Sequence, residues 1–412
     1  MPLEISERAR RMPASPIRKL APHADAARAR GIRVYHLNIG QPDLETPAPM
    51  RDRLATAPRI FAYTPSGGTA ECVASLQEYY RRHGIDLDPS QIVVTTGGSE
   101  AILFALTACA GPGDEALVVE PFYTNDAAVA TMAGVRLVPL RSRGEDGFHL
   151  PPLEEWKRAL TPRTRLVLLC NPNNPTGTVY RRDEVEAVVA FCRENGLFLV
   201  SDEVYRELAF DGAQATSALD VPGTEELAVV VDSLSKRYSA CGIRLGCLAT
   251  RNRSVWDACL RMAQGRLSPP GLAQLVALGA TDLGPEHEEG LVEEYQSRRD
   301  VLFEGLSRIP GVFLRKPEGA FYLVARLPVE DSEDFAAWLL TDFDLEGATV
   351  MVAPAPGFYA TPGLGLDEVR IAYVLNRQDL EASVRILAHA LPAYRAARAL
   401  GPIEAAAEAE AR

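Results

Sequence analysis

Residues 227–246 read LAVVVDSLSKRYSACGIRLG, a short apolar run followed at once by a polar loop that carries a lysine. The run from Leu227 to Val231 predicts a buried strand, and ligands of α/β sheets collect outside the carboxyl ends of strands. The hydroxyls of Ser233 and Ser235 and the guanidinium of Arg244 can surround one dianion with short donors and a bidentate fork. A lone lysine is more often a solvated surface charge. These neighbours nevertheless favour a phosphate site beside the amine of Lys236.

Similar apolar runs recur between residues 91 and 250 and predict the rest of a sheet. With residues 227–231 they make seven candidate strands, the others being Ile92–Thr95, Ala116–Val119, Leu137–Leu140, Leu166–Leu169, Leu197–Val200 and Cys247–Ala249. Most of these runs are continuously apolar, which is typical of strands buried on both faces. Helical patterns, such as those at 100–110 and 182–195, separate several of the strands. We therefore expect an α/β sheet covered by helices.

A second domain is expected, because 412 residues exceed what one hydrophobic core usually organises. Residues 288–307 predict a long helix that leads out of the sheet domain. Beyond it, residues 320–324 and 350–352 predict strands, and residues 332–340 and 379–389 predict helices. We expect a large domain at 48–290 and a smaller α+β domain that combines 1–47 with 291–412.

The composition argues against several classes of function. Lys and Arg number 43 against 55 Asp and Glu, and the net charge of −12 opposes nucleic acid or an acidic membrane surface as a partner. The seven cysteines form no CxxC pair and lie near no histidine cluster, which indicates reduced thiols and no metal site. The sequence shows neither an apolar run of about 18 residues nor a secretory h-region. These features predict a cytoplasmic protein.

A carboxylate follows another apolar run, in residues 197–205, LFLVSDEVY. A buried aspartate needs a cationic partner, because an unpaired charge is costly or is neutralised by a shift of its pKa. A protonated pyridine nitrogen would serve Asp202. The alternative is a helix N-cap at the end of the strand. Tyr205 lies three residues on, near enough to donate to a ring oxygen.

Two further segments lie directly after predicted strands. Residues 171–177, NPNNPTG, place Asn174 at the carboxyl end of a predicted strand, the edge of the sheet where ligands bind. The preferences of turns explain such residues in general, but they do not explain why two asparagines stand beside two prolines at this edge. Residues 95–101, TTGGSEA, join a strand to a helix, so the backbone of Gly98 and Ser99 can hold a phosphate at a helix N-terminus. No GxGxxG follows the strand, which argues against a dinucleotide site.

Together these segments resemble the fold-type I pyridoxal-phosphate enzymes, specifically the class I/II aminotransferase family related to aspartate aminotransferase. The resemblance covers nearly the whole chain, including residues 38–44 (NIGQPDL), 63–67 (YTPSG), 318–322 (EGAFY) and 369–372 (VRIA). It implies the fold of type I PLP-dependent transferases. In that fold a large domain holds a seven-stranded, mostly parallel sheet flanked by helices, and a smaller α+β domain packs beside it.

The resemblance also implies that pyridoxal 5′-phosphate is the cofactor and gives residues roles toward it. Lys236 would form the imine with the cofactor aldehyde and later carry the proton between the substrate α carbon and the cofactor. Asp202 would pair with the pyridine nitrogen, and Asn174 and Tyr205 would hydrogen-bond the ring oxygen. The remaining contacts would come from Gly98, Ser99, Ser233, Ser235 and Arg244 at the phosphate, Tyr123 and Val204 on the ring faces, and Tyr63 from the partner subunit of a homodimer.

For the substrate, the resemblance implies that Arg370 grips the α-carboxylate with help from Asn174 and the Gly40 backbone. An ordinary strand-edge arginine is the alternative for Arg370. Arg266 lies in a Pro-rich loop that, in the family, lines the side-chain pocket of the partner subunit. The guanidinium of Arg266 would either bind the distal carboxylate of a dicarboxylate substrate with two N–H groups or make only a local contact. Residues 352–358 carry two residues more than the family's turn, so the side-chain preference stays open.

We expect a cytoplasmic, homodimeric aminotransferase that moves an amino group from an L-amino acid to a 2-oxo acid by a ping-pong mechanism. The alternative enzyme is a PLP-dependent lyase, decarboxylase or elimination and cyclisation enzyme resembling 1-aminocyclopropane-1-carboxylate synthase. A non-enzyme alternative is a cofactor-sensing regulator that carries a DNA-binding domain. About 45 residues precede the core and show no basic helix-turn-helix, which argues against the regulator.

Overall fold

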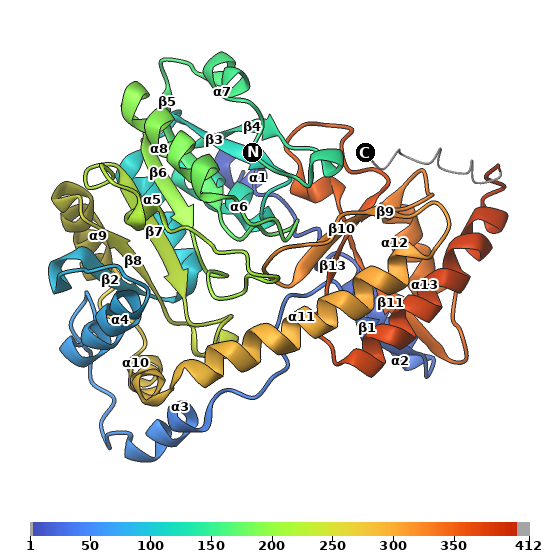
Figure 1. The fold of residues 1–412 in the computed structure, drawn as a ribbon, viewed down its shortest axis with the longest axis horizontal. Helices are drawn as coiled ribbons and strands as arrows, with labels where there is room; N and C mark the ends of the chain where they lie inside the picture. Colours follow the sequence, from blue (N-terminus) through green and yellow to red (C-terminus); the bar gives the residue numbers. More distant parts are fainter. Residues whose placement is uncertain (1–2, 402–412) are drawn as a thin grey trace.

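A seven-stranded sheet forms the centre of the larger half of the computed structural model, which describes residues 3–401 (Figure 1). The strand order is β2-β8-β7-β6-β5-β3-β4; β8 runs antiparallel to both neighbours and the other pairs are parallel. The strands are β2 (Ile92–Thr95), β3 (Glu115–Glu120), β4 (Arg136–Arg141), β5 (Thr164–Cys170), β6 (Phe198–Asp202), β7 (Ala228–Ser233) and β8 (Gly246–Thr250). The seven predicted strands and the mostly parallel α/β fold are therefore confirmed.

Helices cover both faces of this sheet, which explains the continuous apolar runs. Successive side chains of a strand point to opposite faces: Val93 and Val229 pack on one side, Val94 and Val230 on the other. The first face is covered by α5 (Gly97–Cys109), α6 (Thr124–Ala133) and α9 (Arg253–Gly265), and the second by α4 (Ala70–Arg82), α7 (Leu153–Ala159), α8 (Arg182–Asn195) and α10 (Gly271–Ala277).

The smaller half holds two further sheets. An antiparallel sheet has the order β12-β13-β10-β9, and β1 pairs with β11 in parallel. The elements are β1 (Arg33–His36), β9 (Phe313–Leu314), β10 (Tyr322–Arg326), β11 (Ala348–Met351), β12 (Ala353–Pro354), β13 (Glu368–Ala372), α2 (Ala21–Ala29), α12 (Ser332–Thr341) and α13 (Arg377–Ala397). The predicted strands at 320–324 and 350–352 correspond to β10 and β11, and both predicted helices are present. The strands β1, β9, β12 and β13 were not predicted; β9 and β12 have only two residues each, too few for a periodic signal.

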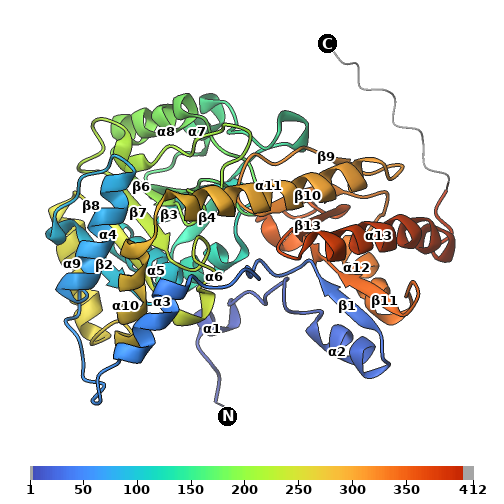
Figure 2. The same ribbon diagram turned by 60° about the horizontal axis from the view of Figure 1, so that its bottom comes forward.

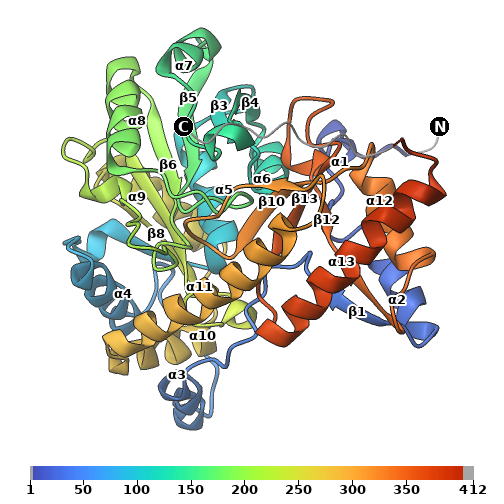
Figure 3. The same ribbon diagram turned by 45° about the vertical axis from the view of Figure 1, so that its right-hand side comes forward.

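The two halves are joined by α11 (Pro285–Ser307), which runs from the large sheet into the smaller half and packs along α13 (Figures 1 and 3). The N-terminal segment also crosses between them, from β1 to α3 (Ala48–Asp52) (Figure 2). The division into 48–290 and 1–47 with 291–412 stays a prediction, and its residues 1–2 and 402–412 lie outside the described range. α11 and α13 are the longest helices, yet no helix within residues 3–401 has both the length and the apolar character to cross a membrane.

Short elements complete the described chain. They are the helix α1 (Glu7–Arg10) and the 3₁₀ segments η1 (Arg53–Thr56), η2 (Pro89–Gln91), η3 (Gly144–Asp146), η4 (Ala218–Asp220), η5 (Cys241–Ile243), η6 (Leu278–Asp282) and η7 (Pro356–Phe358). Of these, η5 lies in the loop between β7 and β8 that the sequence assigns to a phosphate.

Candidate active site

The predicted site segments meet at one edge of the large sheet. β5, β6 and β7 end side by side, with Cys170 opposite Asp202 and Asp202 opposite Val231. β8 runs the other way and begins at the same edge, where Gly246 is opposite Ser233. The loops after β5, β6 and β7, the loop before β8 and the start of α5 therefore converge. These are the segments that carry most of the residues predicted from the sequence.

Hydrogen-bond donors gather where β7 leaves the sheet. The buried side chains of Ser233 and Ser235 are joined by a hydrogen bond of 2.8 Å between their Oγ atoms. Gly97 has a φ of +74°, and a Cβ there would lie 2.5 Å from Arg244 Nη2, so this guanidinium lies on the bare N-terminus of α5. Arg244 Nη1 donates to the Cys241 carbonyl at 3.0 Å, and no carboxylate of residues 3–401 forms an ion pair with Arg244. Two hydroxyls, a helix N-terminus and an available guanidinium fit a dianionic phosphate.

The first turn of α5, with Gly98 and Ser99, lies beside these donors. A Cβ on Gly98 would lie 3.5 Å from Val204 Cγ1 and 3.7 Å from Ser233 Cβ, so three of the predicted segments are in contact. Tyr123 stands immediately before α6, and its Oη accepts a hydrogen bond from Asn125 Nδ2 at 2.7 Å.

Asp202 ends β6 and is 7% exposed. Its Oδ1 accepts a hydrogen bond from the Val204 backbone N–H at 3.3 Å. The residues after Asp202 form a turn and not a helix, so the N-cap alternative does not apply. Burial raises the pKa of this carboxyl from 3.8 to about 7. Within residues 3–401 it forms no ion pair, which leaves room for a protonated ring nitrogen as its partner.

Lys236 faces a segment that comes from the N-terminal part of the chain. Its Nζ donates to the Gly40 carbonyl at 2.8 Å and lies 5.5 Å from the centre of the Phe321 ring. A Cβ on Gly40 would lie 1.7 Å from Tyr322 Oη, so this approach requires glycine. The hydroxyls of Tyr322 and Tyr205 lie 3.1 Å apart. Gly40 therefore lies between the Lys236 amine, which donates to its carbonyl, and the hydrogen-bonded pair of phenols.

Arg370, on β13, is a buried cation held by neutral groups. It is 1% exposed; Nη1 donates to Asn174 Oδ1 at 3.1 Å and Nη2 to the Asn38 carbonyl at 2.5 Å. The guanidinium lies over the rings of Tyr322 and Phe358, at 4.4 and 4.9 Å from their centres. Its Nε has no partner, and no carboxylate of the described chain pairs with it. Since buried charges are normally paired, this arrangement points to an anionic ligand.

Sequence reasoning assigned no role to three residues of this site. Tyr322 and Asn38 lie in segments that carry the family resemblance, but only their contacts with Arg370 and Tyr205 reveal them. Asp126, in the first turn of α6, is a second buried carboxyl, 4% exposed. Burial, and then the charge of Asp202, hold its pKa well above the ordinary value. No sequence signal distinguishes Asp126 from an acidic residue in the first turn of any helix.

Two predicted residues lie apart from this group. Tyr63 is 80% exposed, in the segment between η1 and α4. Arg266 packs locally: Nη2 donates to the Val94 carbonyl at 3.0 Å, and Nε lies 3.3 Å from Glu100 Oε1. The predicted role of Tyr63 toward a partner subunit stays a prediction, and so does the carboxylate-binding role of Arg266.

Known proteins share this fold and sequence. A family model described as aminotransferase class I and II matches residues 32–387. The aspartate/prephenate aminotransferase of Thermus thermophilus is 31% identical over 371 residues, which cover 88% of this chain and 92% of the relative. Aspartate aminotransferase of Geobacillus stearothermophilus is 29% identical over 93% of this chain and 97% of the relative.

Solved structures agree. The aspartate aminotransferase from Thermus thermophilus with maleate has a TM-score of 0.86 at 29% identity, covering 94% of this chain and all of that one. Alanine aminotransferase from Pyrococcus furiosus also has a TM-score of 0.86, at 26% identity, with 95% and 100% covered. The chain belongs to the class I and II aminotransferases. It is a fold-type I enzyme whose cofactor is pyridoxal 5′-phosphate, and its activity is amino-group transfer.

Proposed function

We propose that the enzyme moves the amino group of an L-amino acid to a 2-oxo acid in two half-reactions at the site around Lys236. The buried guanidinium of Arg370 is the observation that carries this proposal. It has two neutral partners and a free Nε, and thus offers a site for the α-carboxylate that every donor and acceptor of such a reaction shares.

The cofactor's site follows from the donors at the sheet edge. Pyridoxal phosphate supplies a cationic ring that accepts the electrons left when a bond to the α carbon breaks. In our proposal Ser233, Ser235, Arg244 and the backbone of Gly98 and Ser99 bind its phosphate, while Tyr123 and Val204 contact the ring faces. Asn174 and Tyr205 hydrogen-bond the ring oxygen.

Asp202 holds the proton on the ring nitrogen. The buried carboxyl with its raised pKa is costly to ionise alone, so a cationic N–H beside it is favourable to both groups. Keeping that nitrogen protonated maintains the positive charge that stabilises the reacting centre.

Lys236 moves the proton at the substrate α carbon. Its Nζ donates to the Gly40 carbonyl and lies 5.9 Å from the centre of the Tyr205 ring, and a hydrogen bond to a backbone carbonyl can be given up when substrate binds. A neutral amine is required for this role.

Arg370 orients the substrate for that step. Its two parallel N–H groups can bind both oxygens of a carboxylate, and the flanking rings restrict how the guanidinium turns. A fixed carboxylate fixes which bond at the α carbon faces the Lys236 amine. We propose that this selects proton removal over loss of the carboxylate.

A homodimer is part of the proposal. Exposed apolar side chains gather in the segment that contains Tyr63 and near the end of α9; they are Leu54, Ile60, Phe61, Tyr63, Leu267 and Leu272. Such a surface is typical of an interface between subunits. Tyr63 would then contact the phosphate in the neighbouring subunit. Light scattering after gel filtration measures the mass of the assembly directly.

We also propose a cytoplasmic location. The seven cysteines are free thiols in the structure, and six of them are buried, as is typical of proteins kept in a reducing compartment. Fractionation of cells with an antibody to the chain tests this location.

The activity is tested with single amino acids in the absence of an oxo acid. A transaminase converts its bound cofactor once per site, with a stoichiometric change in visible absorbance, and then stops until an oxo acid is added. Screening the amino acids in this way also identifies the donor. Continuous product formation from an amino acid alone would contradict the proposal and favour elimination or decarboxylation.

A further inference from the structure

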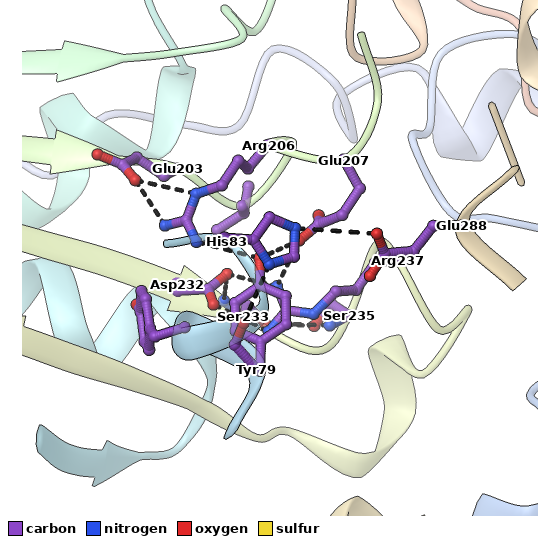
Figure 4. Close-up of polar contacts among 12 residues, drawn as sticks. Tyr79, His83, Glu203, Arg206, Glu207, Asp232, Ser233, Ser235, Arg237 and Glu288 are labelled. Carbon is purple, nitrogen blue, oxygen red and sulfur yellow. Dashed lines mark hydrogen bonds and ion pairs between the residues drawn. The ribbon is translucent and has the colours of Figure 1, made fainter. Parts of the chain in front are cut away.

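The ends of β6 and β7, with the loops that follow them, carry site residues such as Asp202 and Lys236. The same two stretches of chain also carry a cluster of buried charged side chains on their opposite side (Figure 4). We call it the rear cluster; it comprises Tyr79, Glu203, Arg206, Glu207, Asp232 and Arg237, all less than 10% exposed. The alternation of side chains explains its position, because Asp232 lies between Val231 and Ser233 on β7 and so points to the opposite face, the one covered by α4. Each site segment therefore has a charged reverse side.

The strongest contact of the rear cluster joins Asp232 to Arg237. Nη1 and Nη2 of Arg237 donate to Oδ1 and Oδ2 of Asp232 at 2.7 and 2.8 Å, a bidentate pair. The exposed fractions of the two side chains are 1% and 0%. Asp232 Oδ1 also accepts a hydrogen bond from the Ser233 backbone N–H at 2.7 Å.

This ion pair closes residues 232–237 into a ring. The side chains at its two ends are joined, and between them stand Ser233, Ser235 and Lys236. These three residues supply two phosphate hydroxyls and the amine in the proposed function. A bidentate pair fixes both distance and angle, so the Asp232–Arg237 contact limits how far the three side chains can move.

The ring is anchored to the rest of the large half. The Arg237 guanidinium stacks on the Tyr79 ring at 3.9 Å and lies 3.6 Å from Glu207. Tyr79 Oη donates to Glu207 and accepts from Arg206 Nη1 at 3.2 Å, and Arg206 Nη2 donates to Glu203 at 2.5 Å. Through this chain of contacts residues 232–237, which we call the lysine loop, are connected to α4 and to the segment that follows Asp202 (Figure 4).

Burial of so many charges needs a reason other than stability. The attraction within a buried ion pair often does not exceed the free energy lost when both charges leave water. A protein with well-packed apolar residues in place of such a pair is often at least as stable. What a bidentate pair adds is a fixed geometry. The rear cluster lies directly behind the residues whose geometry the reaction requires.

We propose that Asp232 and Arg237 are positioning residues, which hold Ser233, Ser235 and Lys236 where the cofactor phosphate and aldehyde need them. This inference rests on the proposed roles of those three residues. It assigns no contact between the rear cluster and the cofactor or substrate.

The test compares Arg237→Met with the wild-type enzyme. We expect at least a tenfold weaker affinity of the apoenzyme for pyridoxal phosphate and for pyridoxamine phosphate, which cannot form an imine with Lys236. We also expect a lower kcat with a nearly unchanged KM for the amino donor, because Arg370 is untouched. In the apoenzyme, amide hydrogen exchange should become faster at residues 233–240 and stay unchanged in β3–β5.

Arg299→Met is the matched control. Arg299 is as buried (0% exposed) and is ion-paired with Asp211 and Asp300, but it lies on α11 and these partners lie outside residues 232–237. This variant should lose thermal stability and keep its affinity for both cofactor forms. If both variants weaken cofactor binding equally, or if Arg237→Met binds both forms within twofold of wild type, the proposal is overturned.

A conservative variant decides the case in which Arg237→Met does not fold. Arg237→Lys keeps the charge in the rear cluster but loses the planar fork, and an intermediate loss of cofactor affinity is expected. Wild-type affinity and exchange rates in that variant would overturn the proposal. Failure of the proposed function is distinguishable, because the wild-type enzyme itself would then show no amino-acid half-reaction.

Discussion

Arg370 donates a hydrogen bond to Asn174 across the boundary between the two halves of the molecule, at 3.1 Å from Nη1 to Oδ1. Arg370 lies on β13 of the smaller half, and Asn174 lies in the loop after β5 of the large sheet. Both side chains are almost fully buried. The contact therefore sets the distance between the proposed carboxylate-binding guanidinium and the edge of the sheet that holds Asp202 and Lys236.

Replacing Arg370 with Met should lower kcat/KM for every amino donor. The lost partner of a carboxylate corresponds to about 2 to 5 kcal/mol in the transition state. The visible spectrum of the bound cofactor should be unchanged, because Arg370 is not among its proposed contacts. Thermal stability of the apoenzyme should not fall much, since the variant removes a buried charge that has no carboxylate partner. A large loss of stability with normal kcat/KM would show that Arg370 is only structural.

Replacing Lys236 with Ala should abolish transamination and leave the cofactor bound noncovalently. The amine of Lys236 stands at the edge of the sheet, 2.8 Å from the Gly40 carbonyl. Borohydride reduction of the wild-type holoenzyme, followed by peptide mapping, should place the cofactor label on Lys236. A label on a different lysine would refute the assignment.

The buried carboxyl of Asp202 predicts a specific pH dependence of apoenzyme stability. Burial raises its pKa to about 7 in the folded chain, against 3.8 when exposed. The folded state therefore binds this proton more tightly than the unfolded state. The stabilising effect is complete below the unfolded pKa and is lost as the pH rises through the folded pKa, a difference of roughly 4 kcal/mol.

Urea unfolding of the apoenzyme at pH 5 and pH 8 measures the part of this effect that lies above pH 5, about 3 kcal/mol. Asp202→Asn should lose less stability than wild type between these two values, since its amide does not ionise. The same variant should lower the rate of the chemical step by several orders of magnitude, because the ring nitrogen loses its counter-ion. Identical pH profiles for the two proteins would contradict a buried, unpaired Asp202.

Local patterns in the sequence were enough to predict the sheet and the residues at its edge. The strands are continuous apolar runs buried on both faces, and Asp202 and Lys236 stand two and five residues after the ends of two such runs. The fold of the type I family, its cofactor and its amino-transfer activity are confirmed by the comparisons. Short strands such as β9 and β12 carry too few residues to give a pattern.

Contacts between distant residues were not predictable in this way. Tyr79 and Glu207 are 128 positions apart. In the sequence Glu207 is an ordinary polar residue after a strand, and only the packing of α4 beside it shows that it is buried. The rear cluster therefore has no local signature. The Arg370–Asn174 contact spans 196 positions, and the family resemblance was needed to assign Arg370 a carboxylate.

Tyr63→Phe should weaken cofactor retention if Tyr63 contacts the phosphate of the neighbouring subunit. In one chain the Tyr63 side chain is 80% exposed, as an interface residue would be. Mixing this variant with Lys236→Ala under conditions of subunit exchange should restore one site with normal retention per heterodimer. That site combines Lys236 from one subunit with Tyr63 from the other. Absence of recovery after verified exchange would exclude a contribution between subunits.

Arg266→Leu separates a local role from the reading of a substrate carboxylate. Arg266 donates to the Val94 carbonyl and lies beside Glu100, whose Oε2 accepts from the Thr96 N–H at 2.7 Å at the start of α5. The substitution removes the cationic partner of a partly buried carboxylate and the donor to a carbonyl, at a cost of about 1 to 3 kcal/mol in stability. We therefore expect lower stability, weaker phosphate binding by α5 and equal losses of kcat/KM for acidic and neutral donors.

The control for this variant is Arg261→Leu, which removes an exposed arginine of α9, the helix that ends just before Arg266, and should change neither stability nor activity. Kinetics with aspartate, glutamate and alanine then distinguish the two roles of Arg266. A loss of about 2 to 5 kcal/mol in kcat/KM confined to the two acidic donors would show that Arg266 binds their distal carboxylate. Such a result would require the Arg266–Glu100 contact to open when an acidic donor binds.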